Sequence, residues 1–150
     1  MKCLLIPAGV GSFQRAAREL LRPSEVPQEW RQEATSFARL GGFVAESRRA
    51  GLLQFIPDPK GQLDRWCTPS ATLARGGGDC DDLAILCASA LRSSGCRAWI
   101  IVGWRGRESH AWVEGHDERG AWLLEATSGQ VWALGGKRPE PYRAVALLEE

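Results

Sequence analysis

The sequence predicts an α+β domain in which helices come first along the chain and an antiparallel sheet follows. Apolar residues recur at helical spacing through much of the first half, interrupted by glycine and proline. After residue 96 the pattern changes to short apolar runs separated by polar turns, which is typical of strands. Because helices and strands are segregated along the chain, the α+β class is favoured.

Several helices are expected, each ended by a proline or a glycine. Three helices are predicted in the first fifty residues: 12–21, Pro27 to about Leu40, and Phe43 to Ala50. The second of these is expected to end at Gly41-Gly42. Residues 55–79 are rich in proline and glycine and are expected to form a loop. A further helix runs from Asp81 to Gly95, with its leucines and alanines on one stripe.

The expected strands begin with Ala98–Val102, a continuous apolar run that indicates a central strand buried on both faces. Residues 110–114 and 121–125 flank the polar turn 115–120 and are predicted to form a hairpin. Two further strands are expected, at Val131–Leu134 and Arg143–Leu148.

Length and charge limit the class of protein. The 150 residues, 44% hydrophobic and 25% charged, fit one domain over 1–150, with a helical N-terminal part (1–54) and a core that contains the sheet (55–150). A net charge of +1 gives no general attraction to nucleic acid or anionic lipid. The N-terminus lacks the apolar core of a signal peptide, and no apolar run approaches the ~20 residues of a membrane span. We therefore expect a cytoplasmic protein with no nucleic-acid or membrane partner.

The five cysteines are an odd number, so free thiols in a reducing compartment are expected. The sequence contains no CxxC pair, the spacing that would indicate a zinc site. Cys3, Cys67, Cys87 and Cys96 are interpreted as small buried hydrophobic residues.

Cys80 differs from the other cysteines because it lies where a glycine-rich turn, Gly76–Gly78, opens onto a helix. The N–H groups and the dipole at a helix N-terminus favour a thiolate. His110 follows thirty residues later, and Glu125 fifteen after that. Thiol, imidazole and carboxylate in this combination indicate nucleophilic catalysis, although each residue alone has an ordinary structural explanation.

The predicted hairpin brings two of these residues together. If it is symmetric about its turn, Glu114 faces Ala121 and His110 faces Glu125. The carboxylate then accepts the Nδ1–H of the imidazole and leaves Nε2 to face the thiol. The opposite face is wholly apolar and is expected to be core, with Ala111, Val113, Trp122 and Leu124. His116 has the same parity as His110 but lies in the turn, and we assign it to the surface.

The chemistry expected of this set is acyl transfer. Cys80 attacks a carboxamide carbonyl, its backbone N–H holds the oxyanion, and His110 protonates the leaving amine. The resulting thioester is taken by water, in proteolysis or deamidation, or by an amine, in crosslinking. Hydrolysis is favoured because no amine-acceptor site is visible.

Four motifs resemble the transglutaminase-like cysteine proteinase superfamily. They are Pro69-Ser70-Ala71-Thr72-Leu73, Gly78-Asp79-Cys80-Asp81-Asp82, His110-Ala111-Trp112-Val113 and Trp122-Leu123-Leu124-Glu125-Ala126-Thr127. The resemblance implies a papain-like fold, with N-terminal helices and a nucleophile helix packed on an antiparallel sheet, and a protein or peptide substrate. It carries the triad over as Cys80, His110 and Glu125, where Glu125 replaces the usual Asp. Small proteins of this pattern also resemble transglutaminase-like proteins of phage and prophage regions.

The same resemblance suggests further site residues. An upstream Trp or Gln serves some of these families as a second oxyanion donor, and Trp66 is the candidate here, with Asp79 and Trp112 as further substrate contacts. No cofactor is expected, although Asp79, Asp81 and Asp82 resemble the calcium ligands of the bacterial adhesin-cleaving branch. We favour the simpler interpretation that these acids complement the helix dipole.

Two alternatives come from other classes of protein. The fold could be catalytically inactive and serve as a binding or assembly module, with a partner docked through the N-terminal helices. A metal site built from Cys80, His110, His116 and a nearby Asp is a weaker alternative, because the ligand spacing matches no common zinc pattern.

Overall fold

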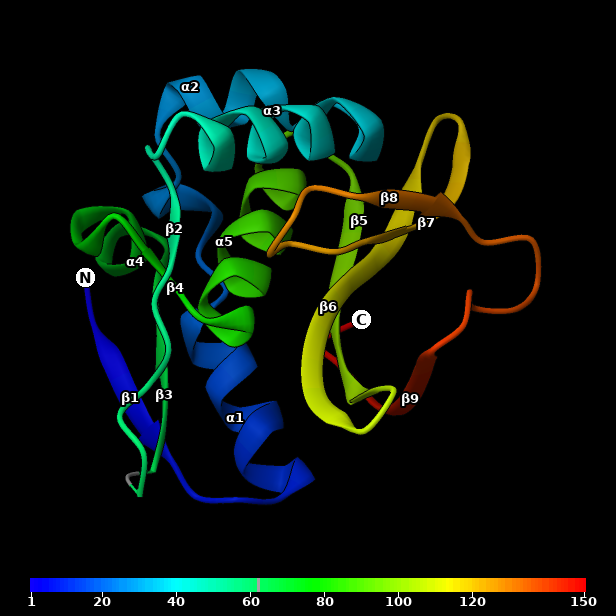
Figure 1. Ribbon diagram of the computed structural model, residues 1–150. Coiled ribbons are helices and arrows are strands. Elements are labelled where there is room, and N and C mark those ends of the chain that lie inside the picture. The colour runs from blue at the N-terminus through cyan, green and yellow to red at the C-terminus, as the bar shows by residue number, and fades with distance from the viewer. Residues whose placement is uncertain (62) are drawn as a thin grey trace.

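The computed structural model describes residues 1–61 and 63–150. Its centre is helix α5 (Cys80–Ser93), which lies between a five-stranded antiparallel sheet on one side and a small two-stranded sheet on the other (Figure 1). Every residue from Asp81 to Leu91 is buried. The Ala- and Leu-rich sequence supports this position, because side chains that are not branched at Cβ favour a helix, and apolar residues on every face allow it to be buried all round. The predicted α+β class is confirmed.

The main sheet is formed by the C-terminal half of the chain in the order β8-β7-β6-β5-β9. Its strands are β5 (Arg97–Arg105), β6 (Glu108–Asp117), β7 (Gly120–Leu124), β8 (Val131–Ala133) and β9 (Tyr142–Leu148). All neighbouring pairs are antiparallel. One face packs on α5, and the other carries a smaller buried cluster of Trp99, Ile101, Trp112 and Leu123. Each expected strand is present, and several extend beyond their predicted ends.

The hairpin of β6 and β7 differs from the predicted register by two residues. Glu114 lies opposite Leu123, and the turn is only Glu118-Arg119. Because the shift is even, the predicted faces are preserved: Ala111, Val113 and Leu124 lie in the main core and Trp122 packs against it. The prediction that His110 and Glu125 are directly opposed is wrong, since the β6–β7 ladder ends at the pair Val113–Leu124.

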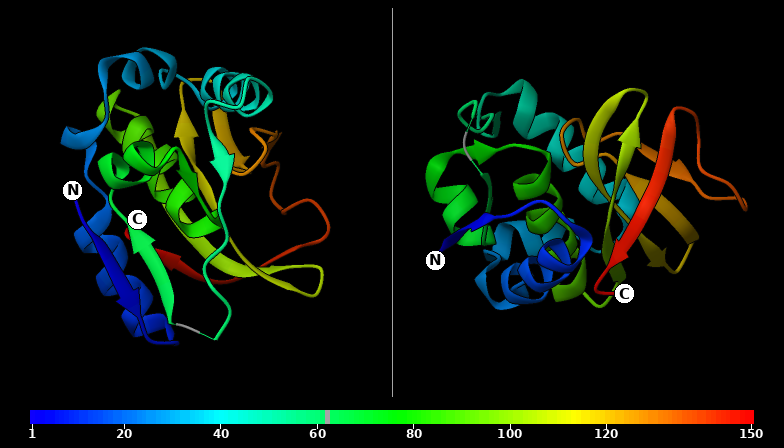
Figure 2. Two further views of the ribbon diagram at one scale, coloured as in Figure 1. Left: turned by 60° about the vertical axis from the view of Figure 1, so that its left-hand side comes forward. Right: turned by 90° about the horizontal axis from the view of Figure 1, so that it is seen from below.

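The helices before the sheet are arranged differently from the prediction. They are α1 (Val10–Leu20), the 3-10 turn η1 (Pro23–Glu25), α2 (Gln28–Glu33) and α3 (Phe37–Arg49). The expected single helix from Pro27 to Leu40 is broken where the Ser36 side chain caps α3 and the Phe37 N–H donates to Asp117. Figure 2 shows α2 and α3 together at one end of α5.

Helix α3 passes through Gly41-Gly42, which the sequence indicated as a helix stop. Gly41 faces the turn before β8, and a Cβ there would collide with the Gly129 carbonyl oxygen and the Val131 side chain. Residue 41 is therefore glycine because α3 lies close to the main sheet, whereas Gly42 has open space around it.

The segment 55–79, expected to be a loop, contains four short elements. They are β2 (Gln54–Phe55), β3 (Asp64–Cys67), α4 (Pro69–Arg75) and β4 (Gly77–Gly78). Residue 62 of this segment lies outside the described residues. Proline is compatible with the first turn of a helix, so Pro69 starts α4 rather than breaking it. The strand β3 depends on a distant partner, since it pairs with β1 (Cys3–Ile6).

A disulfide joins Cys3 of β1 to Cys67 of β3. The expectation that all five cysteines are free is therefore wrong; Cys80, Cys87 and Cys96 are free. Disulfides are typical of oxidising compartments, so the argument from free thiols to a reducing compartment does not hold. In the part of the chain described, none of the helices has the length and apolar character that a membrane crossing requires.

The two adjacent glycines of α3 give a matched test of this packing. Gly41→Ala is expected to lower the free energy of unfolding by about 2 kcal/mol, because the added methyl overpacks the contact with Gly129. Gly42→Ala is expected to raise it by about 0.5–1 kcal/mol, because alanine favours a helix and meets nothing at this position. Urea unfolding of both variants measures the difference; equal effects would contradict the arrangement of α3.

Candidate active site

The start of α5 is fixed by a reciprocal capping box that places Cys80 as the first helical residue. The Asp79 side chain accepts the Asp82 N–H, and the Asp82 side chain accepts the Asp79 N–H at 3.2 Å. A Cβ at Gly78 would lie 2.5 Å from the Asp82 carboxylate, so this box requires a glycine before it. Close packing on Asp82 therefore explains Gly78, whereas Gly77 lies against the Gln54 backbone and Gly76 has a positive φ of 80°.

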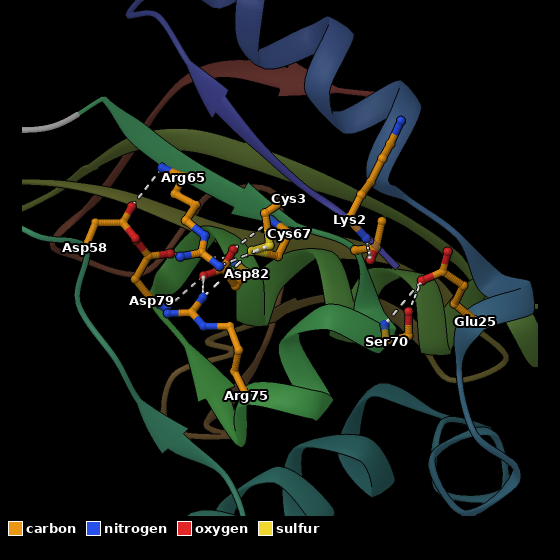
Figure 3. The surroundings of a disulfide bond; sticks show 11 residues. Lys2, Cys3, Glu25, Asp58, Arg65, Cys67, Ser70, Arg75, Asp79 and Asp82 are labelled. Carbon is orange, nitrogen blue, oxygen red and sulfur yellow. Dashed lines mark hydrogen bonds and ion pairs between the residues drawn. A yellow bond between two sulfur atoms is a disulfide. The ribbon is translucent and has the colours of Figure 1, made fainter.

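Asp82 is fully buried and serves the fold rather than a cavity. Its Oδ1 accepts the Cys67 N–H at 2.9 Å, and Arg75 lies 3.7 Å from Oδ2 (Figure 3). Burial raises the pKa of Asp82 to about 6. Asp79, Asp81 and Asp82 are the three acids predicted beside the thiol. Asp82 fits the interpretation that these acids stabilise the start of the helix.

Cys80 and His110 line the same two cavities, although they come from different layers of the fold. The first cavity, of about 330 Å³, is bounded on its far side by acidic residues and by Phe13 of α1. The second, of about 290 Å³, is bounded by Arg48 and Arg105. The thiol and the imidazole therefore border two cavities, one rich in carboxylates and one that contains two arginines and Glu108.

The His110 imidazole is buried and is held by Glu125. Its Nε2 lies 2.7 Å from the Glu125 Oε1. The predicted ring orientation is thus reversed: Nε2 faces the carboxylate, and Nδ1 is the nitrogen left for another partner. Glu125 reaches the ring from the turn after β7, which replaces the cross-strand pairing expected from the sequence.

Glu125 accepts hydrogen bonds from several groups besides the imidazole. Tyr142 Oη donates to Oε1 at 2.6 Å and Arg105 Nη1 donates to the same oxygen at 3.0 Å, while Thr127 Oγ1 donates to Oε2 at 2.8 Å. Although burial opposes ionisation, the hydrogen bond and charge of His110 and the hydrogen bonds from Tyr142 and Thr127 lower the pKa of Glu125 to about 2. The carboxylate is therefore charged over the whole physiological range.

The surroundings of the Cys80 thiol oppose its ionisation. Burial and the charges of Asp81 and Asp79 raise its pKa well above the ordinary value, which outweighs a hydrogen bond from the Ala111 N–H. The Asp81 Oδ1 lies 3.8 Å from Sγ. The raised pKa of Cys80 is the opposite of the lowered pKa that a position at a helix start favours. Among the described residues, no hydrogen bond joins Sγ to the imidazole.

An acidic cluster lies on the wall of the first cavity. Oxygens of Asp58, Asp64 and Asp79 all lie within 4.8 Å of one another, and Asp81 faces Asp64. Within the described part of the chain, the buried Asp58 Oδ1 has no hydrogen-bond partner. Burial and the neighbouring charges raise the pKa of Asp79 to about 9. Converging carboxylate oxygens and an unpaired buried acceptor fit the ligand preferences of a hard divalent cation such as Ca²⁺.

The two tryptophans predicted near the site have different positions. Trp66 lines the first cavity and stacks on Phe13, but its Nε1–H donates to Asp64 at 2.9 Å. Trp112 is buried behind the imidazole, with its Nε1–H donated to Glu114 at 2.8 Å, and it lines neither cavity. His116 lies six residues along β6 from His110, exposed and beside Trp99.

Sequence reasoning did not single out Asp58, Asp64, Arg48, Arg105 or Tyr142. Each reaches the site from a segment distant in the chain, and none lies in a local motif. Asp58, between two prolines in a stretch otherwise read as loop, offered the only local signal among them, because an acid in a proline-bounded turn is fixed in place.

The chain matches the family model described as the CEP76 peptidase-like domain over residues 64–149. This match covers more than half of the chain. The protein belongs to the CEP76 peptidase-like domain family. Among curated proteins it is similar to the centrosomal protein of 76 kDa of Xenopus tropicalis and of Homo sapiens, each 43% identical over 54 residues. The similar segment makes up 35% of this chain but only 8% of each centrosomal protein, so this chain matches a small part of those proteins.

Solved structures show the same fold. Calcium-bound LapG of Legionella pneumophila has a TM-score of 0.57 at 16% identity, covering 95% of this chain and 78% of that one. A putative cysteine protease from Cytophaga hutchinsonii has a TM-score of 0.50 at 17% identity, covering 82% and 46%. The predicted transglutaminase-like, papain-like fold is confirmed. None of these relatives carries a link to phage, and that association stays a prediction.

The lowered pKa of Glu125 predicts a pH-dependent contribution to stability. Glu125→Gln is expected to lower the free energy of unfolding by about 3 kcal/mol at pH 7, because the shift from 4.5 to about 2 favours the folded, charged form. This contribution is complete above pH 4.5 and is lost as the pH falls to about 2. Thermal unfolding from pH 7 to pH 2 measures it, with the exposed Glu29→Gln as control. A deficit that stays constant over this range would contradict the assignment.

Proposed function

We propose that this protein is a cysteine-dependent hydrolase of the peptidase or amidase type, acting on polypeptide substrates. The observation that carries the proposal is that Cys80 and His110 line the same two cavities while a buried carboxylate, Glu125, holds the imidazole. Nucleophile, base and orienting group are the three roles that such chemistry requires. The proposed catalytic set is Cys80, His110 and Glu125.

In the proposed reaction the Cys80 proton passes to Nδ1 of His110 as sulfur attacks a carboxamide carbonyl. Glu125 keeps Nε2 protonated and stabilises the imidazolium. The imidazolium then protonates the leaving amine as the C–N bond breaks, and a thioester remains. Water activated by His110 attacks the thioester, and the acid product and the thiol are released.

The oxyanion formed in each step needs hydrogen-bond donors. The first N–H groups of α5, including that of Cys80, have no partner within the helix and point toward its start. The Trp66 N–H is committed to Asp64, so it serves as a second donor only if that contact is exchanged.

We further propose that Asp58, Asp64 and Asp79 hold a calcium ion. Bound there, a divalent cation supplies positive charge that offsets the carboxylates around the thiol. The fit rests on the converging oxygens and on the unpaired Asp58 Oδ1. A calcium-bound form of LapG is consistent with this proposal.

A catalytically inactive binding module is the second candidate. It is favoured by one observation: the thiol is largely buried beside Asp81 and Asp79, which disfavour the thiolate. In that case the N-terminal helices are the expected docking surface for an assembly partner. Protein crosslinking, with an amine in place of water, is a variant of the catalytic proposal.

The reactivity of Cys80 distinguishes the enzyme from the module. At pH 7 we expect iodoacetamide to modify Cys80 at least tenfold faster in the wild type than in His110→Ala, because the imidazole accepts the thiol proton. Mass spectrometry resolves Cys80 from Cys87 and Cys96, the other free thiols. The matched control is His116→Ala, which removes the other histidine of β6 and is expected to leave the rate unchanged. An unreactive Cys80, or one indifferent to both variants, would favour the module.

Thermal unfolding tests the calcium site. Calcium is expected to raise the Tm of the wild type relative to EGTA-treated protein, and to raise that of Asp79→Asn much less. In EGTA at pH 7 the variant is expected to be the more stable protein, because asparagine still caps α5 and needs no proton on folding, whereas Asp79 must take one up when its pKa rises from 3.8 to about 9. Exposed Glu118→Gln is the control. Equal calcium shifts in the wild type and Asp79→Asn would argue against these ligands.

A further inference from the structure

The second cavity beside Cys80 differs in charge from the first. Its wall away from the thiol is formed by Arg48 at the C-terminal end of α3 and by Arg105 at the end of β5. The first cavity is lined by Asp58, Asp64, Asp79 and Asp81. Cys80 is therefore shared by a cavity lined by four aspartates and by one that contains two arginines.

The Arg48 guanidinium is available to a ligand. Among the described residues no carboxylate lies within 4.0 Å of it, and its recorded contact is a 3.4 Å hydrogen bond donated by Nη1 to the Leu53 carbonyl. Its neighbour Arg49 points to the surface and pairs with Glu46. Consecutive residues on a helix diverge by about 100°, so one arginine faces the cavity while the other faces solvent.

Arg105 has a different role because its charge is already used. It pairs with Glu125 at 3.0 Å and with Glu108 at 3.6 Å. Glu108 also lines the cavity, but its side chain is 67% exposed and is engaged with Arg105. The uncompensated charge of this cavity is therefore that of Arg48.

We propose that the cavity binds a substrate carboxylate, the side chain of an aspartate or glutamate close to the bond that Cys80 attacks. The inference rests on the proposed function and names the substrate class: polypeptide segments with an acidic residue near the reacting carbonyl. A guanidinium matches a carboxylate in shape and forms paired, charge-assisted hydrogen bonds. The volume of about 290 Å³ accommodates a side chain of this size beside the thiol.

Protection of Cys80 tests the proposal without requiring turnover. The probes are two blocked pentapeptides, Ala-Ala-Asp-Ala-Ala and its Asn counterpart, which can slide along the cleft to bring the central residue to either side of the thiol. The measured quantity is the peptide concentration that halves the rate of Cys80 alkylation by iodoacetamide. In the wild type we expect this concentration to be about tenfold lower for the Asp peptide, the ratio that one charge-assisted contact gives.

Variants assign the effect to Arg48. Arg48→Gln is expected to abolish the preference for Asp, Arg48→Lys to retain part of it, and Arg49→Gln to leave it unchanged. Equal protection by the two peptides, protection by neither, or a preference that survives in Arg48→Gln would overturn the carboxylate site. Each of these outcomes leaves the proposed function standing as long as Cys80 alkylation without peptide still depends on His110. Loss of that dependence would instead reject the proposed function.

Discussion

The placement of Asp82 is the constraint on which the site depends. Its buried carboxylate binds the N–H of Asp79, the N–H of Cys67 and the charge of Arg75, so it joins the start of α5 to β3 and α4. A buried carboxylate is stable only if such donors surround it. Because these contacts fix the first turn of α5 against β3, Cys80 lies beside the Asp64 end of that strand, and the thiol and the acidic cluster share one cavity.

The same site holds carboxylates of opposite character. Glu125 is surrounded by donors and keeps its charge down to about pH 2, whereas the pKa of Asp79, surrounded by other acids, rises to about 9. Burial is the first cause acting on both, so the difference comes from their neighbours. On the imidazole side of Cys80, the charge of Glu125 is therefore compensated by hydrogen-bond donors. On the other side, a positive charge bound among the aspartates would stabilise their charged forms.

The sequence predicted the parts of the site that lie in local motifs. The helix start at Cys80, the apolar face of the hairpin and the proximity of His110 and Glu125 follow from spacing and alternation. The exact pairing did not, because a two-residue turn at Glu118-Arg119 preserves every face while moving each pair by two. Likewise, β3 carries no alternation of its own and forms because β1 pairs with it from the far end of the chain. Contacts of this kind are set by tertiary packing and leave no local signal.

The orientation of the imidazole links the fold to its chemistry. With Nε2–H donated to Glu125, the neutral ring carries its lone pair on Nδ1, the nitrogen able to accept a thiol proton. Glu125 is held by hydrogen bonds from three parts of the sheet: Tyr142 of β9, Arg105 of β5 and Thr127 of the turn after β7. Because these contacts fix the carboxylate, they also favour the tautomer with the proton on Nε2. Glu125 lies beyond the last pair of the β6–β7 ladder, and from this position its carboxylate reaches Nε2 of the ring. The pKa of the Cys80 thiol is raised by its burial and, on the acidic side of the site, by the charges of Asp81 and Asp79.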